Sequence, residues 1–67
     1  MSIHEDIDSA CRKIECGEIE GGIIAIFKED ENGLKDTRKA MLTALRYGLK
    51  IEIEPIMEMI HIRAFKR

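Results

Sequence analysis

This chain of 67 residues contains few cysteines and no long hydrophobic run. Its two cysteines are too few for the disulfide framework that stabilises many small secreted domains. No apolar run approaches the roughly 20 residues that a membrane-spanning helix needs. The first residues, Met-Ser-Ile-His-Glu-Asp, also lack the apolar segment of a secretory signal. We therefore expect a cytoplasmic protein that has no membrane as a partner.

Groups for nucleophilic catalysis are sparse as well. The two serines, Ser2 and Ser9, form no triad pattern with a histidine, and Thr37 and Thr43 fall on a predicted helix without a nearby base. The acidic run 29–31 lacks the spacing of a calcium-binding loop and is interpreted as a solvated loop. We expect no catalytic residues, and thus a protein that is not an enzyme.

Metal-ligating residues do not form a recognisable motif. Cys11 and Cys16 are separated by four residues, unlike the C-x2-C pairs of common zinc sites. On a helix they would point about 140° apart, with Cys11 on the apolar face and Cys16 near the helix end. Ligation together with His4 and His61 is the weaker alternative to two exposed histidines. We expect neither a metal nor a cofactor.

Two segments have the periodicity of amphipathic helices. The first covers about residues 3–16, with Ser2 and Glu5 as a capping box and Gly17 as its C-terminal stop. The second covers 34–47 and ends at Gly48. On this second helix the residues expected to share the apolar face are Leu34, Met41, Ala44 and Leu45.

Three segments have the patterns of strands. Residues 23–27 form a continuous apolar run after Gly21-Gly22, which predicts a strand buried on both faces. Residues 28–33 are then a polar loop. Near the C-terminus, apolar residues alternate with polar ones before and after Pro55, which predicts a hairpin with Pro55 at a turn or on an edge strand.

These elements predict an α+β fold in one small domain, residues 1–67, with the order α-β-α-β-β. We expect a three-stranded sheet with a C-terminal hairpin and two helices on one side. The portion 23–53 has the length of a strand–helix–strand unit with parallel strands. The predicted core includes Ile24, Ile26, Leu45, Ile53 and Ile62.

Charge is distributed unevenly along the chain. Residues 1–32 carry nine acidic and three basic residues, a net charge of −6, whereas residues 33–67 carry four acidic and eight basic residues, a net charge of +4; together these give −2. Either the two halves attract each other, within or between subunits, or the basic half binds an anion. The candidate anion-binding residues are Lys35, Arg38, Lys39, Arg46, Arg63 and Lys66.

A chain this short buries only about 60% of the surface that its unfolded form exposes, so self-association is the expected source of further stability. Met57, Met59 and Phe65 are candidates for contact with a protein partner, because methionine adapts to varied surfaces. The sequence predicts a small non-enzymatic interaction module, a homo-oligomer that regulates, inhibits or sequesters a partner. The alternative is a module that binds nucleic acid or a phosphorylated ligand through its basic half.

Overall fold

Two helices and three strands make up the computed structural model, which describes residues 3–67, with side chains from residue 6 onward. They follow in the order α1 (Ile3–Glu15), β1 (Gly21–Lys28), α2 (Glu31–Arg46), β2 (Lys50–Ile56) and β3 (Met59–Phe65). The predicted α+β class and element order are confirmed. The predicted capping box lies outside the part of the chain whose side chains are described.

The last strand in the sequence is the central strand of the sheet. The strand order is β1-β3-β2, and β3 is antiparallel to both neighbours. Strands β1 and β2 thus run in the same direction, as expected for a strand–helix–strand unit, but β3 lies between them and no parallel ladder forms.

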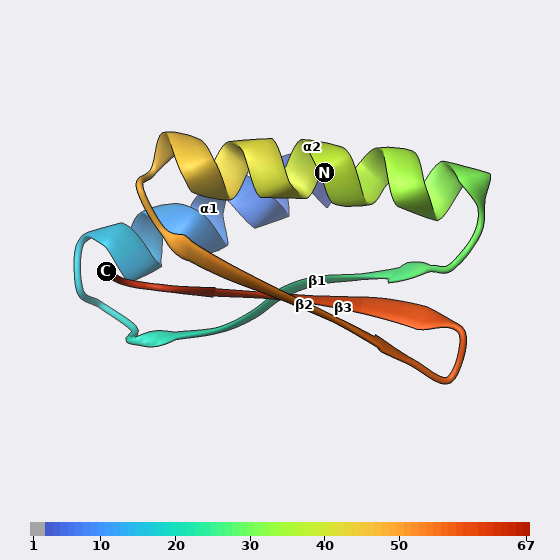
Figure 1. Cartoon of the computed structure of the whole chain (residues 1–67). Coiled ribbons are helices and arrows are strands. Elements are labelled where there is room, and N and C mark those ends of the chain that lie inside the picture. Colours follow the sequence, from blue (N-terminus) through green and yellow to red (C-terminus); the bar gives the residue numbers. More distant parts are fainter. Residues whose placement is uncertain (1–2) are drawn as a thin grey trace.

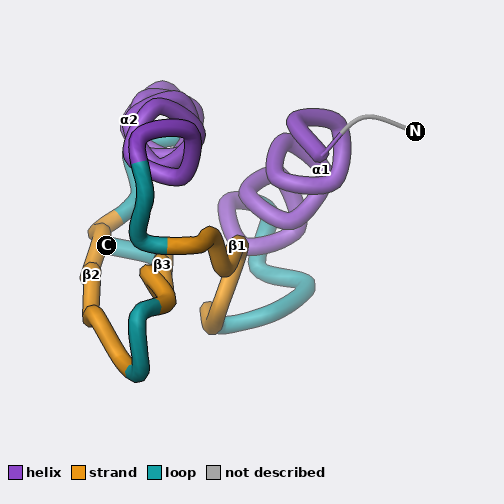
Figure 2. Tube along the Cα trace, turned by 90° about the vertical axis from the view of Figure 1, so that its right-hand side faces the viewer, coloured by secondary structure: helices purple, strands orange, loops and turns teal. Residues whose placement is uncertain are grey.

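Both helices lie on the same side of the sheet, as predicted (Figure 1). Figure 2 shows α2 above the β2–β3 side and α1 above β1. No element within residues 3–67 covers the opposite side, which we call the open face. No helix in this range is long and apolar enough to cross a membrane.

The core fills the space between the sheet and the helices. Strand β3 buries alternate residues, so that Ile62 is fully enclosed and has the central place in the core. Residues Ile7, Cys11 and Ile14 of α1 recur at helical spacing and enter from the other side. The remaining buried apolar residues are Phe27, Ala40, Ala44, Leu49, Ile60 and Ala64.

Helix α2 begins three residues earlier than its hydrophobic pattern indicates. Asp30 is its N-cap, and the Asp30 Oδ1 atom accepts a 2.7 Å hydrogen bond from the backbone N–H of Gly33. A Cβ atom on Gly33 would lie 1.6 Å from the carbonyl oxygen of Lys28, so only glycine permits this approach of α2 to β1. The acidic run after β1 is therefore mostly a cap and a first helical turn, and the predicted polar loop is too long.

The helix ends agree with the sequence prediction. Gly17 and Gly48 have φ values of +84° and +71°, and both follow the last turn of their helices. After α2, the backbone N–H of Leu49 donates to the Ala44 carbonyl over 3.1 Å, which closes the helix with a hydrogen bond from beyond its end.

The hairpin turn lies two residues beyond Pro55. Strand β2 continues through Pro55 to Ile56, and the turn consists of Met57 and Glu58, with φ values of +49° and +65°. Two successive positive φ angles match the twist of a two-residue hairpin, although neither residue is the usual asparagine or glycine. Pro55 thus occupies an edge strand, the second of its two predicted positions.

Candidate interaction surfaces

The centre of the open face consists of the β3 side chains that point away from the helices. Met59, His61, Arg63 and Phe65 alternate with buried residues and are all partly exposed. The sequence places His61, Arg63 and Phe65 on this side, and the structure confirms it. Two of the three candidate partner-binding residues, Met59 and Phe65, thus lie at opposite ends of one surface.

A bulge in β1 adds two isoleucines to the open face. The register with β3 shifts between Ile23 and Ala25, so that Ile23 lies opposite Arg63 and Ile26 opposite His61. Ile23 is 51% exposed and Ile26 is 44% exposed. Ile24 and Ala25 both pack toward the helices instead. We call Ile23, Ile26, Ile56, Met59 and Phe65 the open-face cluster.

The expectation that β1 is buried on both faces is therefore wrong, and so is the placement of Ile26 in the core. Two helices can cover one side of a three-stranded sheet, and no described element covers the other. The bulge also reverses the alternation after Ile24, so that Phe27 is the buried residue of this segment. Ile24 is partly buried against the core. An apolar run without alternation gave no indication of the bulge.

Glycine makes room for the aromatic ring of this cluster. Gly21 lies opposite Phe65, and a Cβ atom there would be 2.6 Å from both the Phe65 ring and the Ala64 carbonyl oxygen. The pair Gly21-Gly22 opens strand β1, and glycine at position 21 permits the close approach of the two strands there.

A polar strip crosses the open face beside the apolar cluster. Arg63 donates to the Glu54 carboxylate over 2.7 Å, and this is the one ion pair among the described residues. Both side chains are partly exposed, so their mutual attraction is screened and contributes at most about 1 kcal/mol to stability. The pair therefore serves better to orient polar groups on this surface than to hold the fold together.

The hairpin tip lies beside the same face. Met57 is almost fully exposed, so its side chain is available for contact with another molecule. Its backbone has positive φ, as does that of Glu58. An exposed methionine in a backbone conformation that costs free energy is a feature that we associate with contact to another molecule.

Helix α2 carries the second exposed apolar surface. The face that it turns to the core consists of small residues, namely Gly33, Thr37, Ala40 and Ala44. Leu34 is 59% exposed and Leu45 is 50% exposed, so the predicted buried positions of these two leucines are wrong. These small side chains allow the helix to lie close to the sheet, an approach that only glycine permits at position 33, and the larger leucines turn outward.

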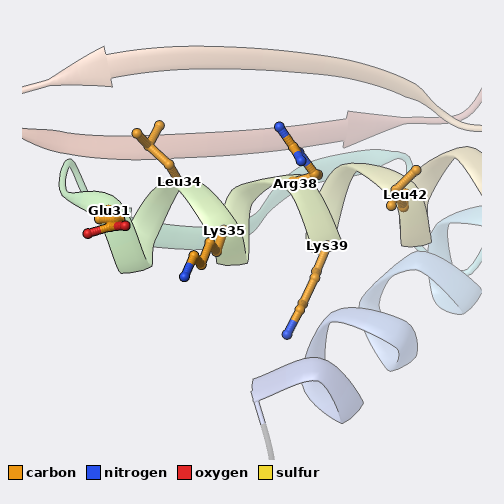
Figure 3. Close-up of a pocket in the computed structure, with 6 residues that line it drawn as sticks. All are labelled: Glu31, Leu34, Lys35, Arg38, Lys39 and Leu42. Atoms are coloured by element: carbon orange, nitrogen blue, oxygen red, sulfur yellow. The ribbon is translucent and has the colours of Figure 1, made fainter.

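A shallow pocket of about 440 Å³ lies on the outer side of α2 (Figure 3). Leu34 and Arg38 extend toward the side of the hairpin strands, whereas Lys35 and Lys39 extend toward the side of α1. The lining residues are Glu31, Leu34, Lys35, Arg38, Lys39 and Leu42. Within the described chain none of its three cations forms an ion pair.

The structure separates the candidate anion-binding residues. Lys35, Arg38, Lys39 and Arg46 are exposed on α2, but Arg63 lies on the open face, beyond the sheet. The Nζ atom of Lys66 lies near Gly17, at the end of α1. The arrangement in which α2 lies beside the exposed face of the hairpin does not occur, so these residues form no single basic surface.

Comparison with other proteins gave no match to a protein family, to a curated protein or to a solved structure. The surfaces of this chain are therefore interpreted from their own geometry.

The edge strand β2 adds one more half-exposed residue. Ile53 lies opposite Ile62 and points to the helix side of the sheet, yet it is 43% exposed. Its predicted place in the core is thus wrong, because β2 is an edge strand and α2 does not extend over its outer side. Ile62, on the central strand, is the core residue that the sequence placed correctly.

The cysteines differ in their surroundings. Cys11 is buried, and desolvation, followed by the nearby charge of Asp8, raises the pKa of its thiol. Cys16 is exposed, and its thiol donates to the Lys13 carbonyl oxygen over 3.4 Å. From Asp6 onward, no three His, Cys, Asp or Glu side chains lie close enough to share a metal ion. The side chain of His4 lies outside this range.

Proposed function

We propose that this chain is a non-enzymatic interaction module that self-associates and holds a protein partner on the open face of its sheet. One observation carries the proposal: within residues 3–67 the three-stranded sheet is covered by helices on one side only, and its other side exposes the open-face cluster. Contiguous apolar side chains exposed on a small domain mark contact surfaces.

The chemistry of this face favours a partner that makes apolar contacts along β1 and at the two ends of β3, and polar contacts between them. Ile23 and Ile26 form the apolar part contributed by β1, and Phe65 adds an aromatic ring, a residue type enriched where proteins bind each other. The Arg63–Glu54 pair provides a donor and an acceptor beside them. Regulation, inhibition or sequestration would follow from covering the partner's own binding site.

A matched pair of variants tests this assignment. Ile23 and Leu42 have almost equal exposures, 51% and 52%, but Ile23 lies on the open face of the sheet and Leu42 lines the pocket on the outer side of α2. Ile23→Ser should remove a partner that the unchanged chain captures, whereas Leu42→Ser should retain it. Equal retention by both variants would contradict the open-face assignment.

A second candidate function is supported by the pocket on α2. Three cations that form no ion pair with any described residue line it, which suits a nucleic acid or a phosphorylated ligand. Affinity for a single-stranded oligonucleotide should then fall with salt, with a log–log slope of roughly −0.7 per phosphate contact. Arg38→Glu should abolish this binding, and Arg63→Glu on the other side should leave it unchanged.

The cellular compartment belongs to the same proposal. An exposed free thiol at Cys16 and a buried one at Cys11 fit a reducing environment such as the cytoplasm. Sedimentation at micromolar concentration tests self-association, since a stable monomer of 7.7 kDa would exclude it.

A further inference from the structure

Strand β2 has a regular outer edge. The hairpin turn has two residues, so its closing pair, Ile56 and Met59, exchanges both backbone hydrogen bonds. Every second residue of β2 then forms backbone hydrogen bonds with β3, and the backbone N–H and C=O groups of the residues between them point outward. The backbone groups of Ile51, Ile53 and Pro55 therefore point away from β3. The 2.8 Å hydrogen bond from the Glu29 N–H to the Glu58 carbonyl agrees with this alternation, because it shows that the Glu58 carbonyl points toward the β1 side.

The outer edge of β2 offers two free N–H donors within the described chain. Pro55 has no N–H, and the N–H of Leu49 already donates to Ala44. The free N–H donors are therefore those of Ile51 and Ile53. The other edge of the sheet, β1, is interrupted by its bulge, which is a common way to prevent pairing. Strand β2 is thus the edge suited to accept another strand.

We infer that β2 pairs with β2 of a second copy of this chain, antiparallel and about a two-fold axis, with Ile51 opposite Ile53 of the second copy. The inference rests on the self-association proposed above and assigns a surface to it. In this register both free donors of each copy find a carbonyl acceptor. A shift by one pair in either direction places Pro55 opposite Ile51 or Leu49 opposite Ile53, and such a pair makes one hydrogen bond in place of two because Pro55 and Leu49 have no free N–H.

The side chains of this register are also compatible with pairing. Lys50 of each copy would lie opposite Glu54 of the other, which gives two pairs of opposite charge. The two copies of Glu52 would face each other and form the single like-charged pair. On the helix side, Ile53 of each copy would be buried against Ile51 of the other.

The same contact explains the outward leucines of α2. Leu34 extends toward the hairpin strands, and Leu45, three turns further, lies on the same side of the helix. Two copies joined along β2 bring these half-exposed leucines toward each other above the shared sheet. Lys35 and Lys39 extend the other way, and the open face stays free for a partner.

Disulfide trapping tests the register. Residues 52 of the two copies would form a non-hydrogen-bonded pair, whose Cα atoms lie about 4.5 Å apart, within disulfide range. In a Cys16→Ser background, Glu52→Cys should give a covalent dimer under mild oxidation. Lys50→Cys should give none, because its two copies would be about 13 Å apart. Ile26→Cys, on the open face, should also give no covalent dimer, whereas face-to-face packing of sheets would link it efficiently.

Two lysine variants separate this inference from the proposed function. Ile53→Lys should convert the dimer to a monomer that keeps its melting transition, because Ile53 is half exposed in the isolated chain. Ile23→Lys should leave the dimer intact. A dimer that survives Ile53→Lys and is not trapped by Glu52→Cys would overturn the β2 pairing alone. A chain that sediments as a monomer before any change would overturn self-association itself.

Discussion

Tyr47 at the C-terminal end of α2 donates a 2.8 Å hydrogen bond from its hydroxyl group to the carboxylate of Asp8 in α1. The two residues are 39 positions apart in the sequence. This bond, followed by partial desolvation and the charge of Asp8, raises the pKa of Tyr47 above its ordinary value of 10.0. The contact links α1 to the end of α2.

Alkaline pH should weaken this link. Because the pKa of Tyr47 is higher in the folded chain than in the unfolded chain, its contribution to stability is complete below about pH 10 and is lost as the pH rises through the folded value. Melting temperatures measured from about pH 9 to pH 12 should therefore fall less steeply for Tyr47→Phe than for the unchanged chain. Parallel curves for the two proteins would contradict the role of this bond.

Gly33→Ala should prevent folding. The added Cβ atom would overlap the Lys28 carbonyl oxygen, and since both groups belong to backbone, relief requires α2 to move away from β1. We expect a loss of several kcal/mol, comparable to the whole stability of so small a domain. Circular dichroism and urea unfolding measure it. Asn32→Ala, one residue earlier on the exposed side of the same turn, should be neutral or slightly stabilising.

The hairpin turn should become more stable with the residues that its backbone favours. Replacing Met57 by Asn and Glu58 by Gly removes the cost of placing ordinary side chains at positive φ, and we expect a gain of about 1 kcal/mol in the free energy of unfolding. The same double variant removes the exposed Met57 side chain. Partner capture that weakens while stability rises would identify the tip as part of the binding surface. A drop in stability would contradict the turn assignment.

Ile62 and Ile26 should respond differently to truncation. Ile62→Ala opens a cavity in the centre of the core and should cost about 3 kcal/mol. Ile26→Ala removes a half-exposed side chain from the open face and should cost less than about 1 kcal/mol in the isolated chain. Chemical denaturation of the two variants gives both values. Equal losses would mean that the open face is covered even when no partner is present.

The two thiols should react at very different rates. Cys16 is exposed and should be modified at once by a thiol reagent in the native protein, whereas buried Cys11, whose thiol pKa is raised, should react only on unfolding. Counting released chromophore before and after denaturant addition should give one thiol and then two. Rapid modification of both in the native state would place α1 away from the sheet.

The sequence predicted elements better than it predicted the surfaces they expose. Alternation in β3 and the glycine stops at Gly17 and Gly48 depend on local chemistry, and these predictions are confirmed. The start of α2 was misplaced because a polar first turn, Glu31 onward, contributes nothing to the hydrophobic pattern.

Burial could not be predicted where it depends on neighbours far away in the sequence. Ile26 and Ile53 have the chemistry of core residues, but the β1 bulge turns the first to the open face and the edge position of β2 exposes the second. In α2, the pattern of leucines outweighed the small residues around Ala40 that in fact contact the core. Arg63 is grouped with the cations of α2 in the sequence prediction because the sequence alone does not show on which side of the sheet the helices pack.

Because β3 is both the central strand and the last of the three strands to be synthesised, the sheet cannot assemble in the order in which the ribosome releases its strands. Strands β1 and β2 do not pair with each other, and each forms its hydrogen bonds only with β3, Met59–Phe65. A nascent chain that ends before residue 59 therefore presents two unpaired strands and an unfilled core. Ribosome-bound chains should remain sensitive to protease until β3 has left the exit tunnel, and then become resistant in a single step.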